Sequence, residues 1–319
     1  MDHLDFAIYR FLSPGGEARF WAGRRIIDAA VPAREIAESV GVSENGVRSR
    51  LRGLVEQGFL RGKALTPNPS LFGVRVFVVP LPIGTPTDAG RVFHDLPLVD
   101  GVVFARDTMD EGEREVQVYI VAPHDSAATR LASLLRRLSP AREVRPPEPY
   151  WIPPCDRELS PLDWRLLDAM GRLPDATVPE VAKAVGVSLK TAAKRAHQLI
   201  ESRACWWTHG PDAEEFPLAL IRLELRDGSE RAAVAAQAAR EAADWIPVAI
   251  DGLGLEPTAA GKVVAGLVPA EAPTVVERTV NKLSAVPGVE GVRRTFALGS
   301  KSYPSWFQDR VADHLANRH

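Results

Sequence analysis

One segment of this sequence occurs twice at a constant spacing. EIAESVGVSENGVRSRLRGLVE at 35–56 returns without a gap as EVAKAVGVSLKTAAKRAHQLIE at 180–201, an offset of 145 residues. A repeat of this kind predicts two copies of one structural unit. The chain of 319 residues also exceeds the usual size of a single hydrophobic core. We therefore expect a tandem, multidomain protein.

The segments around the repeat define the rest of each copy. LDFAIYRFL from Leu4 matches LDWRLLDAM from Leu162 at an offset of 158. The first copy therefore carries an insertion at about residues 13–25, which includes Phe20 and Trp21. The sequence assigns no role to this insertion. A proline-rich stretch at 146–158 separates the copies. Proline disfavours helix interiors and central strands, so this stretch is predicted to be a semi-rigid linker.

Each repeated segment has the pattern of a helix-turn-helix. In the first copy apolar residues at helical spacing end at Gly41, and Ser43 then stands where the N-cap of a second helix belongs. The second copy repeats this pattern around Ser188. Segments resembling a wing follow, GFLRG with KALTPNP in the first copy and ACWWTHG in the second. We expect two winged helix-turn-helix domains.

The outer face of each second helix is cationic, which is typical of a helix that enters the major groove of DNA. A charged helix face can also be merely solvated, but here the turn, the caps and the cations are all repeated. Leu189 joins the polar residues near the start of the second helix as a candidate for reading bases. The predicted DNA-contacting residues are Ser43, Glu44, Asn45, Arg48, Arg50, Arg52, Ser188, Lys190, Thr191, Lys194 and Arg195.

After each helix-turn-helix the pattern changes to alternating, valine-rich strands and amphipathic helices. The first copy is expected to have a strand from Leu71, a helix at 88–96, a hairpin of 102–107 and 115–122 around TMDEGER, a helix at 126–138 and a strand near 141–145. The second copy repeats this order from Pro217. The order βαββαβ predicts a ferredoxin-like domain in each copy, and hence an α+β fold.

The predicted domains follow from these patterns. They are a winged helix-turn-helix at 1–65, a ferredoxin-like effector-type domain at 66–145, the linker at 146–158, a second winged helix-turn-helix at 159–210, a second ferredoxin-like domain at 211–300 and a helix at 301–319. Trp306, Phe307, Val311 and Leu315 form an apolar stripe on that final helix. The stripe either packs within the chain or mediates the pairing of two chains.

The chain resembles the Lrp/AsnC, or feast/famine, family of transcription regulators, twice over. The resemblance rests on Leu-Asp near each start, the E-[IV]-A-x-x-V-G-V-S segment, Arg50 and Arg195, EQGFLRG, and NPSLFGV at 68–74. It implies a regulator that binds double-stranded DNA, with a small-molecule effector whose identity stays open. Family members pair through their effector sheets, so the resemblance implies either a monomer with an internal pseudo-two-fold axis or a homodimer.

Two other functions remain as alternatives. Fused two-copy proteins of this architecture include siroheme decarboxylases, which bind a tetrapyrrole and place a His directly after the Asn that precedes the first effector strand. Here Asn68 is followed by Pro69, and the hairpins VVFARDTMDEGER and IDGLGLEPTAAGK contain neither Tyr nor His. The third possibility is an interaction scaffold without DNA binding.

Composition excludes several classes of protein. The 39 basic and 41 acidic residues give a net charge of -2, so DNA affinity must come from local patches. The histidines show no metal-ligand spacing with Cys155 or Cys205, and the two thiols are expected to be reduced. No apolar run approaches the length of a membrane span. The sequence thus predicts a cytoplasmic, non-enzymatic protein without cofactor, metal or membrane contact.

Overall fold

The computed structural model describes residues 4, 5, 8, 33–56, 64–110, 113–138, 145–150, 152, 155, 157–173, 176–208, 218–242, 244–248, 263–270 and 273–316. Each of its two compact units is assembled from distant parts of the sequence. One unit is formed mainly by Arg75–Ile152 and Pro211–Tyr303, and the other mainly by Ala7–Val74, Pro153–Gly210 and Pro304–His319. The units therefore group like parts of the two copies: strand-rich segments in one, and helix-turn-helix segments in the other.

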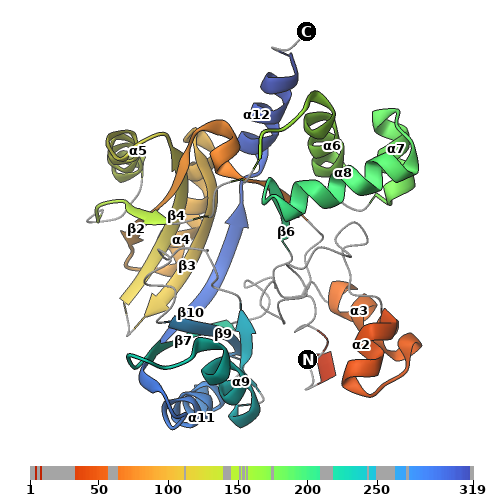
Figure 1. The fold of residues 1–319 in the computed structure, drawn as a ribbon. Coiled ribbons are helices and arrows are strands. Elements are labelled where there is room, and N and C mark those ends of the chain that lie inside the picture. The colour runs from red at the N-terminus through yellow and green to blue at the C-terminus, as the bar shows by residue number, and fades with distance from the viewer. Residues whose placement is uncertain are drawn as a thin grey trace. The chain divides into compact units, whose positions relative to one another are not determined.

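The strand-rich unit contains both βαββαβ segments (Figure 1). The first segment consists of β2 (Arg75–Pro82), α4 (Pro86–Asp95), the 3-10 helix η2 (Leu96–Leu98), β3 (Val102–Asp110), β4 (Glu113–Ala122), α5 (Asp125–Leu138) and β5 (Glu148–Tyr150). The second consists of β7 (Leu218–Leu225), α9 (Arg231–Glu241), β8 (Ile246–Val248), β9 (Val263–Pro269), α11 (Pro273–Ser284) and β10 (Val289–Ser302). The order of elements in both copies confirms the predicted fold class.

All eight of these strands form one sheet in the order β5-β2-β4-β3-β10-β7-β9-β8. The two four-stranded halves meet at β10, the long blue strand in Figure 1. The first part of β10 pairs with β7, and its last part pairs antiparallel with β3, from Phe296 opposite Met109 to Ser302 opposite Phe104. The last strand of the second copy therefore completes the sheet of the first.

Each half of the sheet has its own apolar core beneath its helices. In the first half, Phe77, Val118 and Ile120 are fully or almost fully buried in one cluster. Tyr303, which follows β10, joins this cluster, and its hydroxyl donates to the Phe93 carbonyl oxygen over 3.2 Å. The second half has a separate core around the fully buried Trp245. Tyr303 thus carries the end of the second copy into the core of the first.

The helical unit contains the two helix-turn-helix segments and a final helix. Its elements are α2 (Ala33–Val40), α3 (Glu44–Glu56), β1 (Ala64–Pro67), η1 (Pro69–Phe72), α6 (Pro161–Arg172), α7 (Val178–Val185), α8 (Leu189–Glu201), β6 (Cys205–Thr208) and α12 (Ser305–Ala316). The wing-like segments of the two copies pair with each other, because β1 and β6 form a two-stranded antiparallel sheet. None of the helices in the described parts of the chain has the length and apolar composition to cross a bilayer.

The strand predicted from Leu71 begins later, at Arg75. Leu71 and Phe72 belong instead to η1, which starts after Asn68, whose side chain accepts from the Ser70 N–H. Gly73 ends η1 with a φ of 67°. Phe72 makes edge contacts with Trp164 and Trp306, at 5.8 and 5.7 Å between ring centroids. The packing of this aromatic ring outweighs the local β propensity of the sequence.

Several other predicted elements differ from those observed. The strand β5 lies inside the stretch predicted as linker, where it pairs with the edge of β2. The β3–β4 hairpin is tighter than predicted, with paired residues as far as Asp110 and Glu113. The apolar stripe of α12, by contrast, follows the first of its two predicted roles: it packs within the chain, on α6 of the helical unit, where Trp306, Phe307 and Val311 are buried. The insertion at 13–25 and the turn at 252–261 lie outside the described residues.

Candidate nucleic-acid interface

The first candidate recognition helix, α3, starts as the sequence predicted. Gly41 has a φ of 73°, a left-handed conformation that ends α2 without the steric cost of a side chain. The Ser43 hydroxyl then accepts from the Gly46 N–H over 3.1 Å, which is the hydrogen bond of an N-cap. Val47 and Leu54 are buried. The apolar side of α3 is thereby fixed inward, and the polar side is left at the surface.

The predicted contact residues of α3 differ in exposure. Ser43, Asn45, Arg48 and Arg52 are exposed, whereas Glu44 and Arg50 are half-buried. Glu44 and Arg48 form an ion pair along the helix, with Arg48 Nη2 2.6 Å and Nε 3.1 Å from Glu44 Oε1. The charge of Arg48 is therefore already matched by a carboxylate within the same helix.

The second candidate recognition helix, α8, is built in the same way. Gly186 takes a φ of 74° at the turn, and the Ser188 hydroxyl accepts from the Thr191 N–H over 3.2 Å. Ala192, Ala196 and Leu199 are buried against α6 and α7. The repeated turn and the repeated cap confirm the predicted start of α8.

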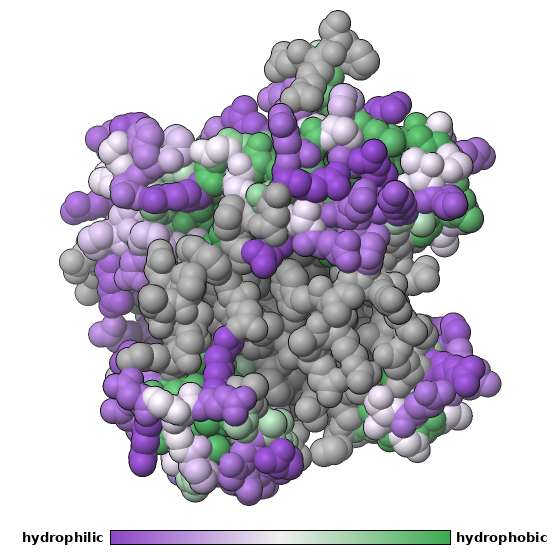
Figure 2. All heavy atoms as spheres, viewed as in Figure 1, coloured by the Kyte–Doolittle hydropathy of each residue, from purple (hydrophilic) through white to green (hydrophobic). Residues whose placement is uncertain are grey.

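The outer face of α8 is polar, with one apolar exception. Ser188, Lys190 and Lys194 are exposed, and the Leu189 side chain is exposed to 54%. The Thr191 hydroxyl is hydrogen-bonded to that of Ser188 at 2.8 Å. Figure 2 shows a mostly hydrophilic surface where α8 lies in Figure 1. In the part of the chain that the structure describes, Lys190 and Lys194 form no ion pair.

Arg195 has a different environment from the two lysines. Its Nη1 lies 3.6 Å from a carboxylate oxygen of Asp163, in the first turn of α6. This interaction links the recognition helix to the helix behind it, and gives Arg195 a role within the domain. Its predicted DNA contact stays a prediction.

Asp163 is the residue that sequence reasoning missed. It is almost completely buried, and Oδ2 accepts from the Ser160 hydroxyl at 2.7 Å, from the Ser160 N–H at 3.0 Å, and from the Arg157 guanidinium. Burial disfavours the charged form, but these hydrogen bonds outweigh it and hold the pKa of Asp163 below its ordinary value. The signal was present in the sequence: the repeated Leu-Asp and the Ser-x-x-Asp spacing of a capping box.

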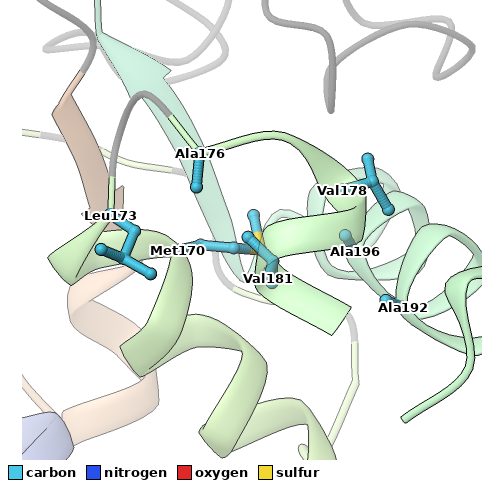
Figure 3. A pocket seen from close by; sticks show the side chains of 7 residues that line it. All are labelled: Met170, Leu173, Ala176, Val178, Val181, Ala192 and Ala196. Carbon is cyan, nitrogen blue, oxygen red and sulfur yellow. The ribbon is translucent and has the colours of Figure 1, made fainter. Parts of the chain in front are cut away.

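A shallow pocket lies within the second helix-turn-helix (Figure 3). It is lined only by apolar side chains from α6, α7, α8 and the turn between α6 and α7: Met170, Leu173, Ala176, Val178, Val181, Ala192 and Ala196. Its volume of about 10 Å³ corresponds to roughly one water molecule. With neither room nor polar groups, this pocket does not suit an amino-acid effector.

The strand-rich unit has an aromatic cluster on the sheet face opposite the core of the first half. Phe104, Tyr119 and Tyr150 form a chain of edge contacts, with centroids 5.2 and 5.1 Å apart. The Arg106 guanidinium lies 5.5 Å from the centroid of the Phe104 ring. Burial and the neighbouring Tyr119 raise the pKa of Tyr150, so its phenol stays protonated. Among described residues no carboxylate pairs with Arg106.

No protein-family model matches the chain. The HTH-type transcriptional regulators LrpA of Pyrococcus horikoshii and of Pyrococcus abyssi are each 28% identical to it over 96 residues, which cover 30% of this chain. The matched residues span 66% of each regulator's length, just under two thirds. Among solved structures, the siroheme decarboxylase NirDL is similar over 100% of both chains, with a TM-score of 0.50 and 11% identity.

Proposed function

We propose that this chain is a DNA-binding transcription regulator and not an enzyme; its partial similarity to the regulator LrpA supports the proposal. The observation that carries the proposal is the matched construction of α3 and α8. Each helix follows a glycine turn, is capped by a serine, buries an apolar side and presents cations outward. This is the geometry with which a helix-turn-helix enters a major groove.

The two helices present different side chains to a double helix. Glu44, Asn45 and Arg48 near the start of α3 correspond to Leu189, Lys190 and Ala193 in α8. In a homodimeric regulator both recognition helices are identical, so the operator is palindromic. A single chain with unlike helices is expected to prefer an asymmetric site.

Binding to DNA is tested by fluorescence anisotropy with duplex DNA at increasing salt. Contact through phosphates predicts at least about a tenfold loss of affinity between 50 and 200 mM salt. The double variant Arg48→Ala/Lys194→Ala is expected to bind more weakly than wild type. Unchanged affinity in that variant would remove both helices from the interface. Selection from random duplexes then tests the asymmetry, and recovery of perfect palindromes alone would contradict it.

A second candidate function is tetrapyrrole binding, and one observation in this chain favours it. Tetrapyrroles are flat, and siroheme carries several carboxylates. Phe104, Tyr119 and Tyr150 offer ring surfaces beside Arg106, which has no carboxylate partner in the described parts of the chain. Aromatic surface and an available guanidinium suit such a ligand. Against this function, Pro69 stands directly after Asn68 where the siroheme decarboxylases place a His.

Absorbance titration separates the two candidates. A saturable shift of the siroheme spectrum that is lost in Arg106→Ala would favour the tetrapyrrole function. An unshifted spectrum, together with salt-dependent DNA binding, would favour the regulator. Arg130→Ala serves as the matched control, since Arg130 is an exposed arginine of α5 that belongs neither to the aromatic cluster nor to a recognition helix.

A further inference from the structure

The repeat allows the two recognition helices to be compared position by position. At the offset of 145, Glu44 corresponds to Leu189 and Asn45 to Lys190. Arg48 corresponds to Ala193, and Ser49 to Lys194. The first six residues of α3 therefore carry one acid and one base, whereas the first six residues of α8 carry two bases and no acid. The scaffold is shared, but the charge of the exposed face is not.

The charges at the start of α3 cancel locally. Arg48 and Glu44 are joined by the ion pair at 2.6 Å, and both side chains keep substantial exposure, 62% and 43%. A phosphate that approaches Arg48 must compete with a carboxylate that is already bound. Glu44 also repels the DNA backbone. The start of α3 is therefore a poor source of sequence-independent affinity.

The charges on α8 do not cancel. Lys190 and Lys194 are exposed and form no ion pair among the described residues, and the first turn contains no acidic side chain. A lysine near the positive end of a helix dipole is unfavourable for helix stability. An anion bound in front of the helix would relieve this repulsion. The other ionisable side chains on α8 have partners: Arg195 lies near Asp163, and His197 lies 2.9 Å from Glu201.

We infer that the two helices have divided roles on DNA, an inference that rests on the proposed function. Helix α8 supplies most of the salt-dependent affinity through Lys190 and Lys194. Helix α3 supplies discrimination, because Arg48 binds only Oε1 of Glu44, and Oε2 must be satisfied by another donor once it enters the groove. In the major groove the amino groups of cytosine and adenine are such donors, whereas guanine and thymine present acceptors. Glu44 is therefore assigned as a specificity-determining residue.

The two roles are tested on the full chain in two ways: fluorescence anisotropy measures binding to duplex DNA, and selection from random duplexes gives the preferred sequence. Lys190→Gln/Lys194→Gln is expected to weaken binding to every duplex and to lower the slope of log K against log salt by about two, while the selected sequence stays the same. Lys183→Gln, an exposed lysine of α7, is the matched control and leaves the slope unchanged. Thermal unfolding of each variant checks that the fold is intact.

Glu44→Ala is expected to act in the opposite direction. It removes the carboxylate that holds Arg48, so affinity for random DNA rises several-fold, and the preference for cytosine or adenine at one position of the selected site is lost. The inference is overturned if wild type binds DNA but the double lysine variant keeps its salt slope. It is also overturned if Glu44→Ala keeps the base preference. Wild type that binds no duplex overturns the proposed function itself.

Discussion

The two ferredoxin-like domains share a strand order but differ in their last strand, the closing strand of each domain. In the first domain the closing strand β5 spans only Glu148–Tyr150 and, among the described strands, pairs with β2. In the second domain the closing strand β10 spans Val289–Ser302 and pairs with β7 and then with β3 of the first domain. Repetition of a sequence pattern thus fixes the order within each domain, and the length of one strand decides how the domains join.

The two helix-turn-helix segments differ in the same manner. Their turns and caps are alike, but in the second copy the buried Asp163 connects Ser160, Arg157 and Arg195, and α12 covers α6. Asp5 occupies the equivalent sequence position in the first copy and is only half-buried. The copies are therefore expected to respond unequally to equivalent changes.

The largest effect on stability is expected at two tyrosines. Tyr303 follows the closing strand β10, and Tyr150 ends the closing strand β5. Tyr303→Ala removes a buried ring from the core of the first domain and should lower the free energy of unfolding by about 3 kcal/mol. Tyr150→Ala removes a half-buried ring from the sheet face opposite that core and should cost less, about 1 kcal/mol. Urea unfolding measures both values. Equal costs would contradict the asymmetry, and Tyr303→Phe, which loses only one hydrogen bond, is the control.

A smaller loss of stability is expected when the buried carboxylate of the second helix-turn-helix, that of Asp163, is removed. Asp163→Ala leaves Arg157 and Arg195 without their shared partner and removes the carboxylate that accepts from the Ser160 N–H in the capping box of α6. Both arginines are partly solvated, so the cost is placed at about 2 kcal/mol, below that of a fully buried pair. Asp5→Ala should cost less than half as much. Thermal unfolding of the two variants would refute the comparison if their losses were the same.

The same carboxylate predicts a pH dependence of stability. Because the pKa of Asp163 is lowered in the folded protein, its contribution is fully present above the ordinary carboxylate pKa of about 4. The contribution is lost as the pH falls through the lowered value. The stability gap between wild type and Asp163→Asn should therefore be constant from pH 7 to 5 and shrink below pH 4. A gap that grew in acid would exclude this explanation.

The smallest change in stability is expected from a substitution at Arg203, just after α8. It has a φ of 58°, while the first copy has glycine at the matching position, Gly58. A side chain in the left-handed region costs about 1–2 kcal/mol, and glycine costs roughly 0.5–1 kcal/mol of entropy. Arg203→Gly should therefore stabilise the chain by about 0.5 kcal/mol. A loss of stability in urea unfolding would mean that contacts of the arginine outweigh the strain.

Much of this fold could be predicted from local sequence signals. Glycine turns, serine caps and apolar periodicity placed α3 and α8, and strand alternation placed most of the sheet. Pairing between β3 and β10 could not be predicted, because it depends on residues far apart in sequence. The end of β10, Gly-Ser-Lys-Ser at 299–302, also has low β propensity and gave no sign of a strand.

The candidate interface was predicted by residue type, and its geometry was not. A cation on a helix surface has the same sequence signature whether it faces solvent, a neighbouring acid or a ligand. Only the packing of α6 against α8 reveals that Arg195 lies near Asp163. Only the side-chain geometry shows that Arg48 forms an ion pair with Glu44, whereas Lys190 forms no ion pair among the described residues.

The shared strand β10 has a consequence for how the chain is made. During synthesis β2, β3 and β4 leave the ribosome long before residues 296–302, so the edge of β3 that β10 will cover waits unpaired. An unpaired edge strand is a template for pairing with other chains. Nascent chains of this protein should therefore pass through a stage that is prone to aggregation, and that stage ends only when the second copy delivers its last strand.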